Sequence, residues 1–351
     1  MIMPVDIVSS DQGSPLCSVF GTCGGCQYQD ISYEEELRIK NEFLRDLLAR
    51  AGMLADPSVL DPVVPSPRIY HYRSRLDLRL LKTGDQNVFV GFTARDRKQL
   101  VEIGACPIAM PAVSDFLPEL KRLASEKLPV KYRNANLVVK TGDDGRVHWG
   151  GIGRRSLKMA EDDFFWTEVD GRRIHYGLDS FFQANLSILP ELFRRIRAMG
   201  ILSSRTRLYD IYGGVGLFGI CLGAEVGEVL LLEENIHAVT TARYNARYNG
   251  FTNFFFYEGR MEDHAVVFAG ITSPSVAVID PPRNGLSPSA CDLLCAAAFD
   301  HLLYLSCNPQ SMTRDLSRFL ESGWQILKII PFDFFPRTKH IETLIQLRRN
   351  G

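Results

Sequence analysis

The second half of the chain is a series of short apolar segments separated by stretches of helical character. Four of these segments, each ending at a polar or glycine-rich turn, cover residues 208–212, 230–232, 276–279 and 302–305. A continuous apolar run is typical of a strand that is buried on both faces of a parallel sheet. From about residue 166 onward, the sequence therefore predicts repeated β-α-β units.

The N-terminal part contains a predicted amphipathic helix. Ser32 opens a capping box with Glu35, and Gly52 closes the segment. The apolar stripe of this helix contains Leu37, Leu44, Leu47, Leu48 and Met53. Its polar face is basic and contains Arg38, Lys40, Arg45 and Arg50. Such a face could meet phosphate, but we expect it to be solvated.

Between these parts the pattern changes twice. Residues 56–68 contain four prolines and are predicted to form a linker. Residues 73–80 then alternate with period two, with leucines on one face and arginines on the other. The leucines are Leu76, Leu78 and Leu80, and the arginines are Arg73, Arg75 and Arg79. Short strands and turns continue to residue 165 around one predicted helix at 111–126, which favours a small α+β domain.

The arginine face of this domain has two interpretations. Tyr70, Tyr72, Phe89 and Phe92 are interleaved with its basic residues. Basic strands with aromatic side chains suit contact with an RNA backbone and stacking on RNA bases. A solvated sheet face would give the same pattern. The rest of the chain favours RNA.

Three regions follow from these patterns. We expect an N-terminal loop and helix at 1–65, a central α+β domain at 66–165 and an α/β, Rossmann-like domain at 166–351. The chain has 351 residues, of which 46% are hydrophobic and 23% charged, as in soluble globular proteins. The net charge of -1 excludes a generally basic nucleic-acid footprint, so any RNA-binding surface must be local.

The sequence shows neither a signal peptide nor an apolar run long enough to span a membrane. We therefore expect a cytoplasmic protein without membrane contact. The eight cysteines are then free thiols or metal ligands rather than disulfides.

Three cysteines lie within ten residues. Cys17, Cys23 and Cys26 form C-x5-C-x2-C, and Cys106 stands far away in the sequence. Four thiolates at such spacing suit a [4Fe–4S] cluster or a structural zinc ion. The distant fourth ligand and the absence of a second C-x2-C motif favour iron–sulfur over a zinc ribbon. We predict that the three cysteines Cys221, Cys291 and Cys295 pack in the core.

Three motifs follow predicted strands in the last domain. They are Asp210-Ile211-Tyr212-Gly213-Gly214-Val215-Gly216, Asp280-Pro281-Pro282-Arg283 and Ser306-Cys307-Asn308-Pro309. Ligands of open α/β sheets bind beyond the carboxyl ends of the strands, so one crevice should hold a glycine-rich loop, a carboxylate and a thiol. Glu233, twenty residues after Gly213, suits the ribose hydroxyls of a nucleotide-like cofactor. This combination predicts covalent catalysis beside a bound cofactor.

The chain resembles the RNA uracil-5-methyltransferase family, whose members make 5-methyluridine in ribosomal or transfer RNA. Besides the cysteine quartet, the three motifs and Glu233, two further segments match. They are Phe182-Gln183-Ala184-Asn185 and His340-Ile341-Glu342-Thr343. The matching features span residues 17–343. The resemblance implies a class I methyltransferase domain beside a smaller α+β domain that carries an iron–sulfur site.

The same resemblance implies roles for single residues. Cys307 would add to C6 of uracil, because a thiolate is a strong nucleophile near neutral pH. Glu342 would remove the C5 proton after methyl transfer, and Asp280 would lie where cofactor and uracil meet. The residues implied in S-adenosylmethionine binding are Gln183, Tyr212, Gly214, Glu233 and Asp280. Arg283 could stabilise an enolate or bind phosphate.

The resemblance also bears on the substrate. The cysteine quartet favours 23S ribosomal RNA over transfer RNA, which stays the alternative, and we expect a monomer. Many relatives begin with a β-barrel domain, for which the chain in front of Cys17 leaves no room. A non-catalytic RNA-binding assembly factor on the same fold is the other alternative, although Cys307 and Glu342 are both present.

Overall fold

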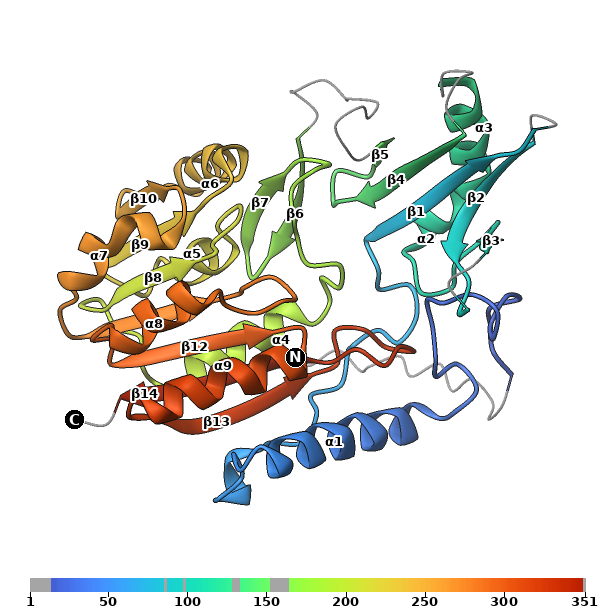
Figure 1. Cartoon of the computed structure of the whole chain (residues 1–351). Coiled ribbons are helices and arrows are strands. Elements are labelled where there is room, and N and C mark those ends of the chain that lie inside the picture. The colour runs from blue at the N-terminus through green and yellow to red at the C-terminus, as the bar shows by residue number, and fades with distance from the viewer. Residues whose placement is uncertain (1–13, 85–86, 97–98, 128–132, 152–163, 350–351) are drawn as a thin grey trace.

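A computed structural model describes residues 14–84, 87–96, 99–127, 133–151 and 164–349. Figure 1 shows a five-stranded sheet on the right, a larger seven-stranded sheet on the left and a short β-hairpin between them. A long N-terminal helix, α1 (Tyr33–Arg50), runs beneath both parts. None of the described helices combines the length and the hydrophobicity that a membrane span requires.

The seven-stranded sheet has the order β10-β9-β8-β11-β12-β14-β13. Its parallel strands are β8 (Arg207–Ile211), β9 (Glu228–Glu233), β10 (Phe254–Glu258), β11 (Ser275–Ile279) and β12 (His301–Ser306). The last two strands, β13 (Trp324–Phe332) and β14 (Glu342–Arg349), form a hairpin, and β14 pairs antiparallel with β12. The four predicted apolar segments correspond to β8, β9, β11 and β12, which confirms the α/β prediction.

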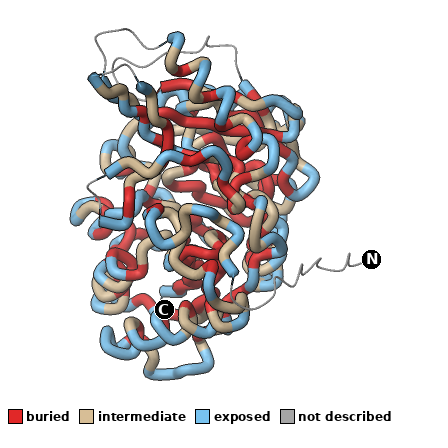
Figure 2. The backbone as a smooth tube through the Cα atoms, turned by 90° about the vertical axis from the view of Figure 1, so that its right-hand side faces the viewer, coloured by how far each residue is buried: buried red, intermediate tan, exposed pale blue. Residues whose placement is uncertain are grey.

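Helices cover both faces of this sheet. One hydrophobic core lies between the sheet and α1, α7 (Ala265–Ala269), α8 (Pro288–Ala296) and α9 (Pro309–Glu321). The other core lies between the sheet and α4 (Leu189–Ala198), α5 (Leu217–Leu222), α6 (Ile236–Tyr248) and the hairpin of β6 (Phe165–Val169) and β7 (Arg172–Tyr176). Figure 2 shows these buried strands running through the molecule beneath exposed helices. Cys221, Cys291 and Cys295 are buried in these cores, as predicted.

The smaller sheet has the order β3-β2-β1-β4-β5 and is antiparallel throughout. Its strands are β1 (Arg75–Lys82), β2 (Val88–Thr93), β3 (Leu100–Glu102), β4 (Asn134–Thr141) and β5 (Val147–Gly151). Leu76, Leu78 and Leu80 are buried, which confirms the alternating pattern of β1. They pack in a separate core with α2 (Pro111–Asp115) and α3 (Leu117–Lys127).

The prediction of one helix at 111–126 was wrong. The structure has α2 and α3 instead, with Phe116 as the C-cap of α2. Pro118 explains the break, because proline has no N–H with which to continue the hydrogen-bond pattern toward Ser114.

The proline-rich segment is not a free linker. Its single 3-10 turn covers Pro57–Val59, and its later residues follow the edge of β13. Leu60 pairs with Ile329 there, and Val64 pairs with Phe332. Outside this segment, another 3-10 turn covers Met261–His264. The proline-rich segment therefore joins the N-terminal helix to the large sheet through residues 60–64.

Helix α1 begins and ends as predicted, and Arg38, Arg45 and Arg50 of its polar face are exposed as expected. Ser32 accepts a hydrogen bond from the Glu35 amide, and Gly52 has a φ of 70°. Lys40, which we expected on a solvated face, is only 2% exposed. One partner is Glu36 of the same helix. The other two, Asp333 and the Phe335 carbonyl, lie about three hundred residues away, where the sequence pattern of the helix gives no indication of them.

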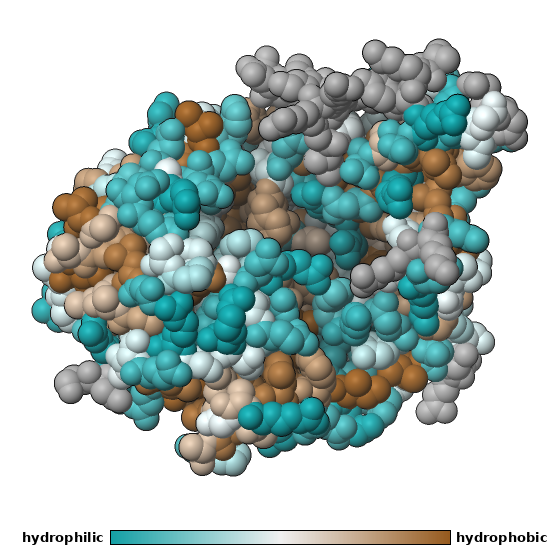
Figure 3. Space-filling model, in the orientation of Figure 1, coloured by the Kyte–Doolittle hydropathy of each residue, from teal (hydrophilic) through white to brown (hydrophobic). Residues whose placement is uncertain are grey.

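Figure 3 shows that hydrophilic side chains cover most of one face of the molecule, with apolar side chains scattered among them. Such scattered apolar residues are normal for a globular protein.

Candidate active site at the carboxyl edge of the large sheet

The topology brings the predicted site residues to one edge of the seven-stranded sheet. The Asp210–Gly216 loop, Glu233, Asp280 and Cys307 all lie at or just beyond the ends of parallel strands. Glu342 is the first residue of β14, and β14 runs in the opposite direction, so its beginning lies at the same edge. Ser306 pairs with Thr343 in the antiparallel β12–β14 ladder. The next position of this register places Cys307 opposite Glu342.

Two loops are fixed to each other beside Cys307. Asn308 donates a hydrogen bond through Nδ2 to the Arg283 carbonyl at 2.9 Å, and its Oδ1 caps α9 by accepting from the Gln310 amide at 3.2 Å. Ser311 also donates to the Arg283 carbonyl, at 3.1 Å. The motifs around Asp280 and Cys307 are therefore one unit, with the thiol at the N-terminus of α9.

Three acidic groups share this site. Burial is the main cause that raises the pKa of Cys307 to about 11, and the neighbouring carboxyls of Glu342 and Asp280 raise it further. Burial also raises the pKa of Glu342 well above its ordinary value, with Asp280 adding to the effect. The pKa of Asp280 rises to about 7 through burial, although Gln183 Nε2 donates to its Oδ2 at 3.2 Å. These shifts show that the site disfavours negative charge.

Arg283 opposes that effect. Its guanidinium lowers the pKa of both Cys307 and Glu342. Its Nη2 donates to His340 Nδ1 at 3.2 Å, so the ring proton of a neutral His340 must be on Nε2. Burial, followed by the nearby Arg283, lowers the pKa of His340 to about 4, which keeps the ring neutral. Sequence reasoning left the role of Arg283 open and did not find this pair.

The glycine-rich loop has the shape of a cofactor cradle. Tyr212, Gly214 and Gly216 all have positive φ, of 60°, 54° and 92°. The Gly214 amide donates to Glu233 Oε2 at 3.0 Å, which joins the loop to the end of β9. A Cβ at Gly213 would lie 2.7 Å from Leu231, so the backbone there approaches the sheet too closely for any side chain.

Asp210 is buried beneath this loop. Its Oδ2 accepts from the Gly219 amide at 2.9 Å, and its Oδ1 has no partner among the described residues. Burial raises its pKa to about 7. Such an unpaired buried oxygen fits a loop whose remaining polar contacts come from a ligand. The sequence signal was present, because Asp210 begins the glycine-rich motif.

Asn185 lies outside the acidic site and is fully buried. Its Nδ2 donates to Ser66 Oγ at 2.9 Å and to the Phe334 carbonyl at 3.1 Å. It therefore joins chain segments together and does not line the site.

A wide cleft of about 1170 Å³ opens in front of Cys307. Its cationic lining residues come from both halves of the molecule and are Arg79, Arg95, Arg283 and Lys339. Among the described residues that line it, the only carboxylate is that of Asp77, which already pairs with Arg75. The predicted basic and aromatic residues of this region therefore do not share one surface. Arg79 of β1 lines the cleft, whereas Tyr72, which precedes β1, is buried in the core.

The four predicted metal ligands line one smaller cavity of about 210 Å³. Cys23 pairs with Ala94 beyond the end of β2, and the Gly24 amide donates to the Thr93 carbonyl at 3.1 Å. Burial raises the pKa of Cys26 to about 12 and also raises that of Cys106. Among the described residues, no three His, Cys, Asp or Glu side chains converge closely enough to hold a single metal ion.

The sequence profile of the tRNA (Uracil-5-)-methyltransferase family matches residues 153–350. The chain belongs to this family. It is therefore an RNA methyltransferase, and all strands of its large sheet lie within the matched segment.

Proteins with the name of uncharacterized RNA methyltransferase are similar over nearly the whole chain. That of Thermosynechococcus vestitus is 27% identical over 386 residues, which cover 97% of this chain and 85% of the relative. That of Aquifex aeolicus is 28% identical over 380 residues, with 99% and 87% covered.

One solved structure has the same fold. It is Pyrococcus abyssi tRNA (uracil-54, C5)-methyltransferase in complex with S-adenosyl-L-homocysteine. The TM-score is 0.69 at 23% identity, with 92% of this chain and 85% of that chain covered.

The pKa of Cys307 gives the first prediction for this methyltransferase. At pH values well below a pKa of about 11, the thiolate fraction of Cys307 rises about tenfold per pH unit. The rate of Cys307 alkylation by iodoacetamide should therefore rise about tenfold for each pH unit between pH 7 and pH 9. The rate is measured by peptide mass spectrometry, with Cys307→Ala as the blank for the other thiols.

Two variants should shift this profile in opposite directions. Asp280→Asn removes a negative neighbour and should move the profile to lower pH, whereas Arg283→Gln removes a positive neighbour and should move it to higher pH. Shifts of the same sign in both variants would contradict the described electrostatics of the site.

Proposed function

We propose that this RNA methyltransferase transfers a methyl group to C5 of a uridine through a covalent bond between Cys307 and C6 of the base. The observation that carries the proposal is the meeting of a thiol and two buried carboxyls, Cys307, Glu342 and Asp280, at one sheet edge. Uracil C5 is a poor nucleophile, and addition of a thiolate at C6 makes it an enolate carbon. S-adenosylmethionine, when bound, supplies the electrophilic methyl group on a sulfonium ion.

The residues of the site then have successive tasks. Arg283 favours the thiolate of Cys307, which bonds to C6 and leaves C5 able to take the methyl group. Glu342 accepts the C5 proton, and the electron pair of that C–H bond expels the thiolate from C6. A general base works best when its pKa is near the working pH, which suits a carboxyl whose pKa is raised by burial.

The glycine-rich loop and Glu233 fit S-adenosylmethionine. Tyr212 and Gly214 form the loop at the end of β8, Glu233 provides carboxylate oxygens for ribose hydroxyls, and Gln183 with Asp280 closes the side toward Cys307. The unpaired Asp210 oxygen beneath the loop supports a ligand there.

The cysteine cavity fits a [4Fe–4S] cluster better than a zinc ion. Each cysteine of such a cluster binds its own iron, so the four sulfur atoms need not meet at one point, whereas zinc requires all four within about 2.3 Å of the metal. The donor set is Cys17, Cys23, Cys26 and Cys106, and the part of the chain that the structure describes places no carboxylate in the lining of the cavity.

RNA fits the cationic cleft in front of Cys307. We favour 23S ribosomal RNA, because the cysteine quartet resembles that of the ribosomal RNA enzymes. Transfer RNA is the second candidate, since the Pyrococcus abyssi protein of the same fold acts on it. A non-catalytic assembly factor would have no need of Cys307 and Glu342 in one pocket.

The two catalytic variants should fail at different steps. Cys307→Ala should form no covalent RNA complex and transfer no methyl group. Glu342→Gln should add to C6, accept the methyl group and then stall, because removal of a positioned base slows proton transfer by about 10²–10⁴-fold. Denaturing electrophoresis with radiolabelled methyl groups should show methylated RNA attached to Glu342→Gln.

Wild-type enzyme with 5-fluorouridine RNA provides the positive control, because fluorine cannot leave as a cation. Formation of 5-methyluridine by Cys307→Ala, or normal turnover by Glu342→Gln, would refute the mechanism.

Glu233→Ala should weaken binding of S-adenosylmethionine by about 1.5–3 kcal/mol, the value of a hydrogen bond to a charged group. Isothermal titration calorimetry measures the change. Glu234→Ala, an exposed neighbour, is the matched control and should bind as the wild type does. If Glu233→Ala binds S-adenosylmethionine as tightly as Glu234→Ala does, Glu233 is not a cofactor ligand.

Anaerobically purified protein should be brown and contain about four iron atoms per chain. Cys106→Ser should lose most of this iron, and Cys221→Ser, which alters a buried thiol of the methyltransferase core, should keep it. Metal analysis and the visible absorption spectrum provide the readout. Stoichiometric zinc without iron would refute the cluster.

A further inference from the structure

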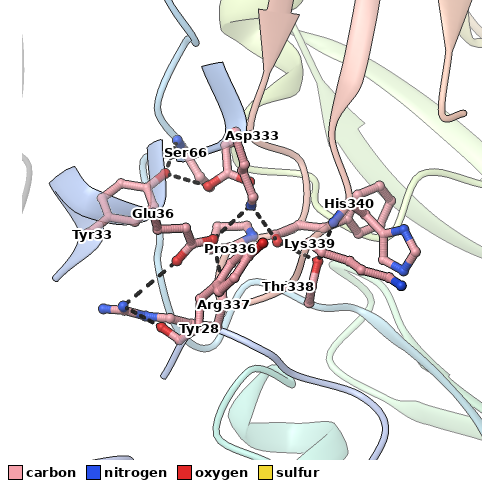
Figure 4. Close-up of polar contacts among 12 residues, drawn as sticks. Tyr28, Tyr33, Glu36, Ser66, Asp333, Pro336, Arg337, Thr338, Lys339 and His340 are labelled. Carbon is pink, nitrogen blue, oxygen red and sulfur yellow. Dashed lines mark hydrogen bonds and ion pairs between the residues drawn. The ribbon is translucent and has the colours of Figure 1, made fainter. Parts of the chain in front are cut away.

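Four charged side chains are buried together beneath the loop that leads to Glu342. Glu36, Lys40, Asp333 and Arg337 are 0%, 2%, 0% and 3% exposed. Lys40 Nζ lies 2.7 Å from Glu36 Oε1 and 2.7 Å from Asp333 Oδ1. Tyr33 donates to the other Asp333 oxygen at 2.9 Å. Figure 4 shows these contacts, with α1 on one side and the loop between β13 and β14 on the other.

These contacts hold the backbone of the loop, residues 333–341. Lys40 donates to the Phe335 carbonyl at 3.2 Å, and Glu36 Oε1 accepts from the Arg337 amide at 2.8 Å. The Arg337 carbonyl accepts from the amides of Gln27 and Tyr28 at 2.9 and 3.1 Å. Both main-chain polar groups of Arg337 are therefore fixed by the N-terminal part of the chain.

Arg337 has a φ of 66°, a conformation that residues with side chains rarely adopt. Such strain persists only where the surroundings impose it, and it is common near functional sites. The Arg337 side chain contributes to holding it, because Nη1 donates to the Ile31 carbonyl at 3.0 Å and to the Tyr28 carbonyl at 3.2 Å.

The far end of the loop forms one side of the catalytic cleft. Lys339 and His340 line the cleft, His340 accepts from Arg283, and Glu342 follows two residues later. Phe332 and Glu342, which flank the loop, pair across the β13–β14 ladder. A change in the path of the loop would therefore move Glu342, whereas Arg283 is also held through its carbonyl by Asn308 and Ser311.

Fold stability alone is a poor reason for this cluster. Burial of charges is costly, and a buried ion pair often stabilises a protein no more than well-packed apolar residues do. Here two carboxylates and two cations balance, and they join α1 to a loop that is about three hundred residues away. Moreover, α1 lies outside the segment that the family profile matches, residues 153–350.

We propose that Lys40 and Arg337 are positioning residues for the proton-removal step, and that α1 thereby holds Glu342 at its working distance from the bound uridine. The inference rests on the proposed function. It assigns to the N-terminal helix a part in the reaction.

Lys40→Met tests the proposal, because it keeps the length of the side chain and removes all three hydrogen bonds of Lys40. Since a small misplacement of a catalytic group can cost about 100-fold, we expect kcat to fall about 10–100-fold. Adduct formation with 5-fluorouridine RNA and the affinity for S-adenosylmethionine should stay within about threefold of wild type. During turnover of uridine RNA, the methylated covalent complex should accumulate.

Arg337→Gly is the second variant, and it keeps the test valid if Lys40→Met does not fold. Glycine tolerates the φ of 66° and keeps both main-chain contacts. The variant loses the side-chain hydrogen bonds to Tyr28 and Ile31, the ion pair with Glu36 at 3.7 Å and the contacts with the Tyr33 and Tyr70 rings. It should accumulate the same methylated complex. Arg38→Met, an exposed residue of the same helix, is the matched control and should behave as the wild type does.

The outcomes separate two failures. If adduct formation and proton removal fall in parallel, or if neither changes in a folded variant, the positioning role is wrong. If the wild-type enzyme forms no adduct with 5-fluorouridine RNA, the proposed function itself fails.

Discussion

Three acidic side chains are held away from water at one edge of a sheet, and the rest of the structure serves that arrangement. Burial raises the pKa values of Cys307, Asp280 and Glu342, and the charge of Asp280 raises those of Cys307 and Glu342 further. Only a rigid support keeps such groups together. The parallel strands deliver the thiol and Asp280, and the reversed strand β14 delivers Glu342 to the same edge.

The cation beside this site, Arg283, is held in place by its neighbours. Arg283 is the cation that lowers the pKa of both Cys307 and Glu342, and its place depends on Asn308, Ser311 and His340. His340 in turn belongs to the loop that α1 holds from below. The chemistry at the sheet edge thus depends on side chains outside the group of three acidic residues.

Sequence patterns predicted what is local or periodic. The capping box of Ser32, the alternation of β1 and the strand-end positions of Asp280 and Cys307 all follow from short-range rules, and the structure has them. Long-range partners were beyond such rules. Lys40 was placed on a solvated face because its partner Asp333 comes almost three hundred residues later. The Arg283–His340 pair was missed for the same reason, and the proline-rich segment was taken for a linker although it follows β13.

The central claim is that this methyltransferase makes 5-methyluridine with Cys307. Nucleoside mass spectrometry of ribosomal and transfer RNA from cells with and without the gene tests it most directly. The account predicts loss of 5-methyluridine from at least one position of 23S ribosomal RNA, with recovery when the wild-type gene is returned and none with Cys307→Ala. An unchanged 5-methyluridine content of both RNA classes in cells without the gene would contradict it.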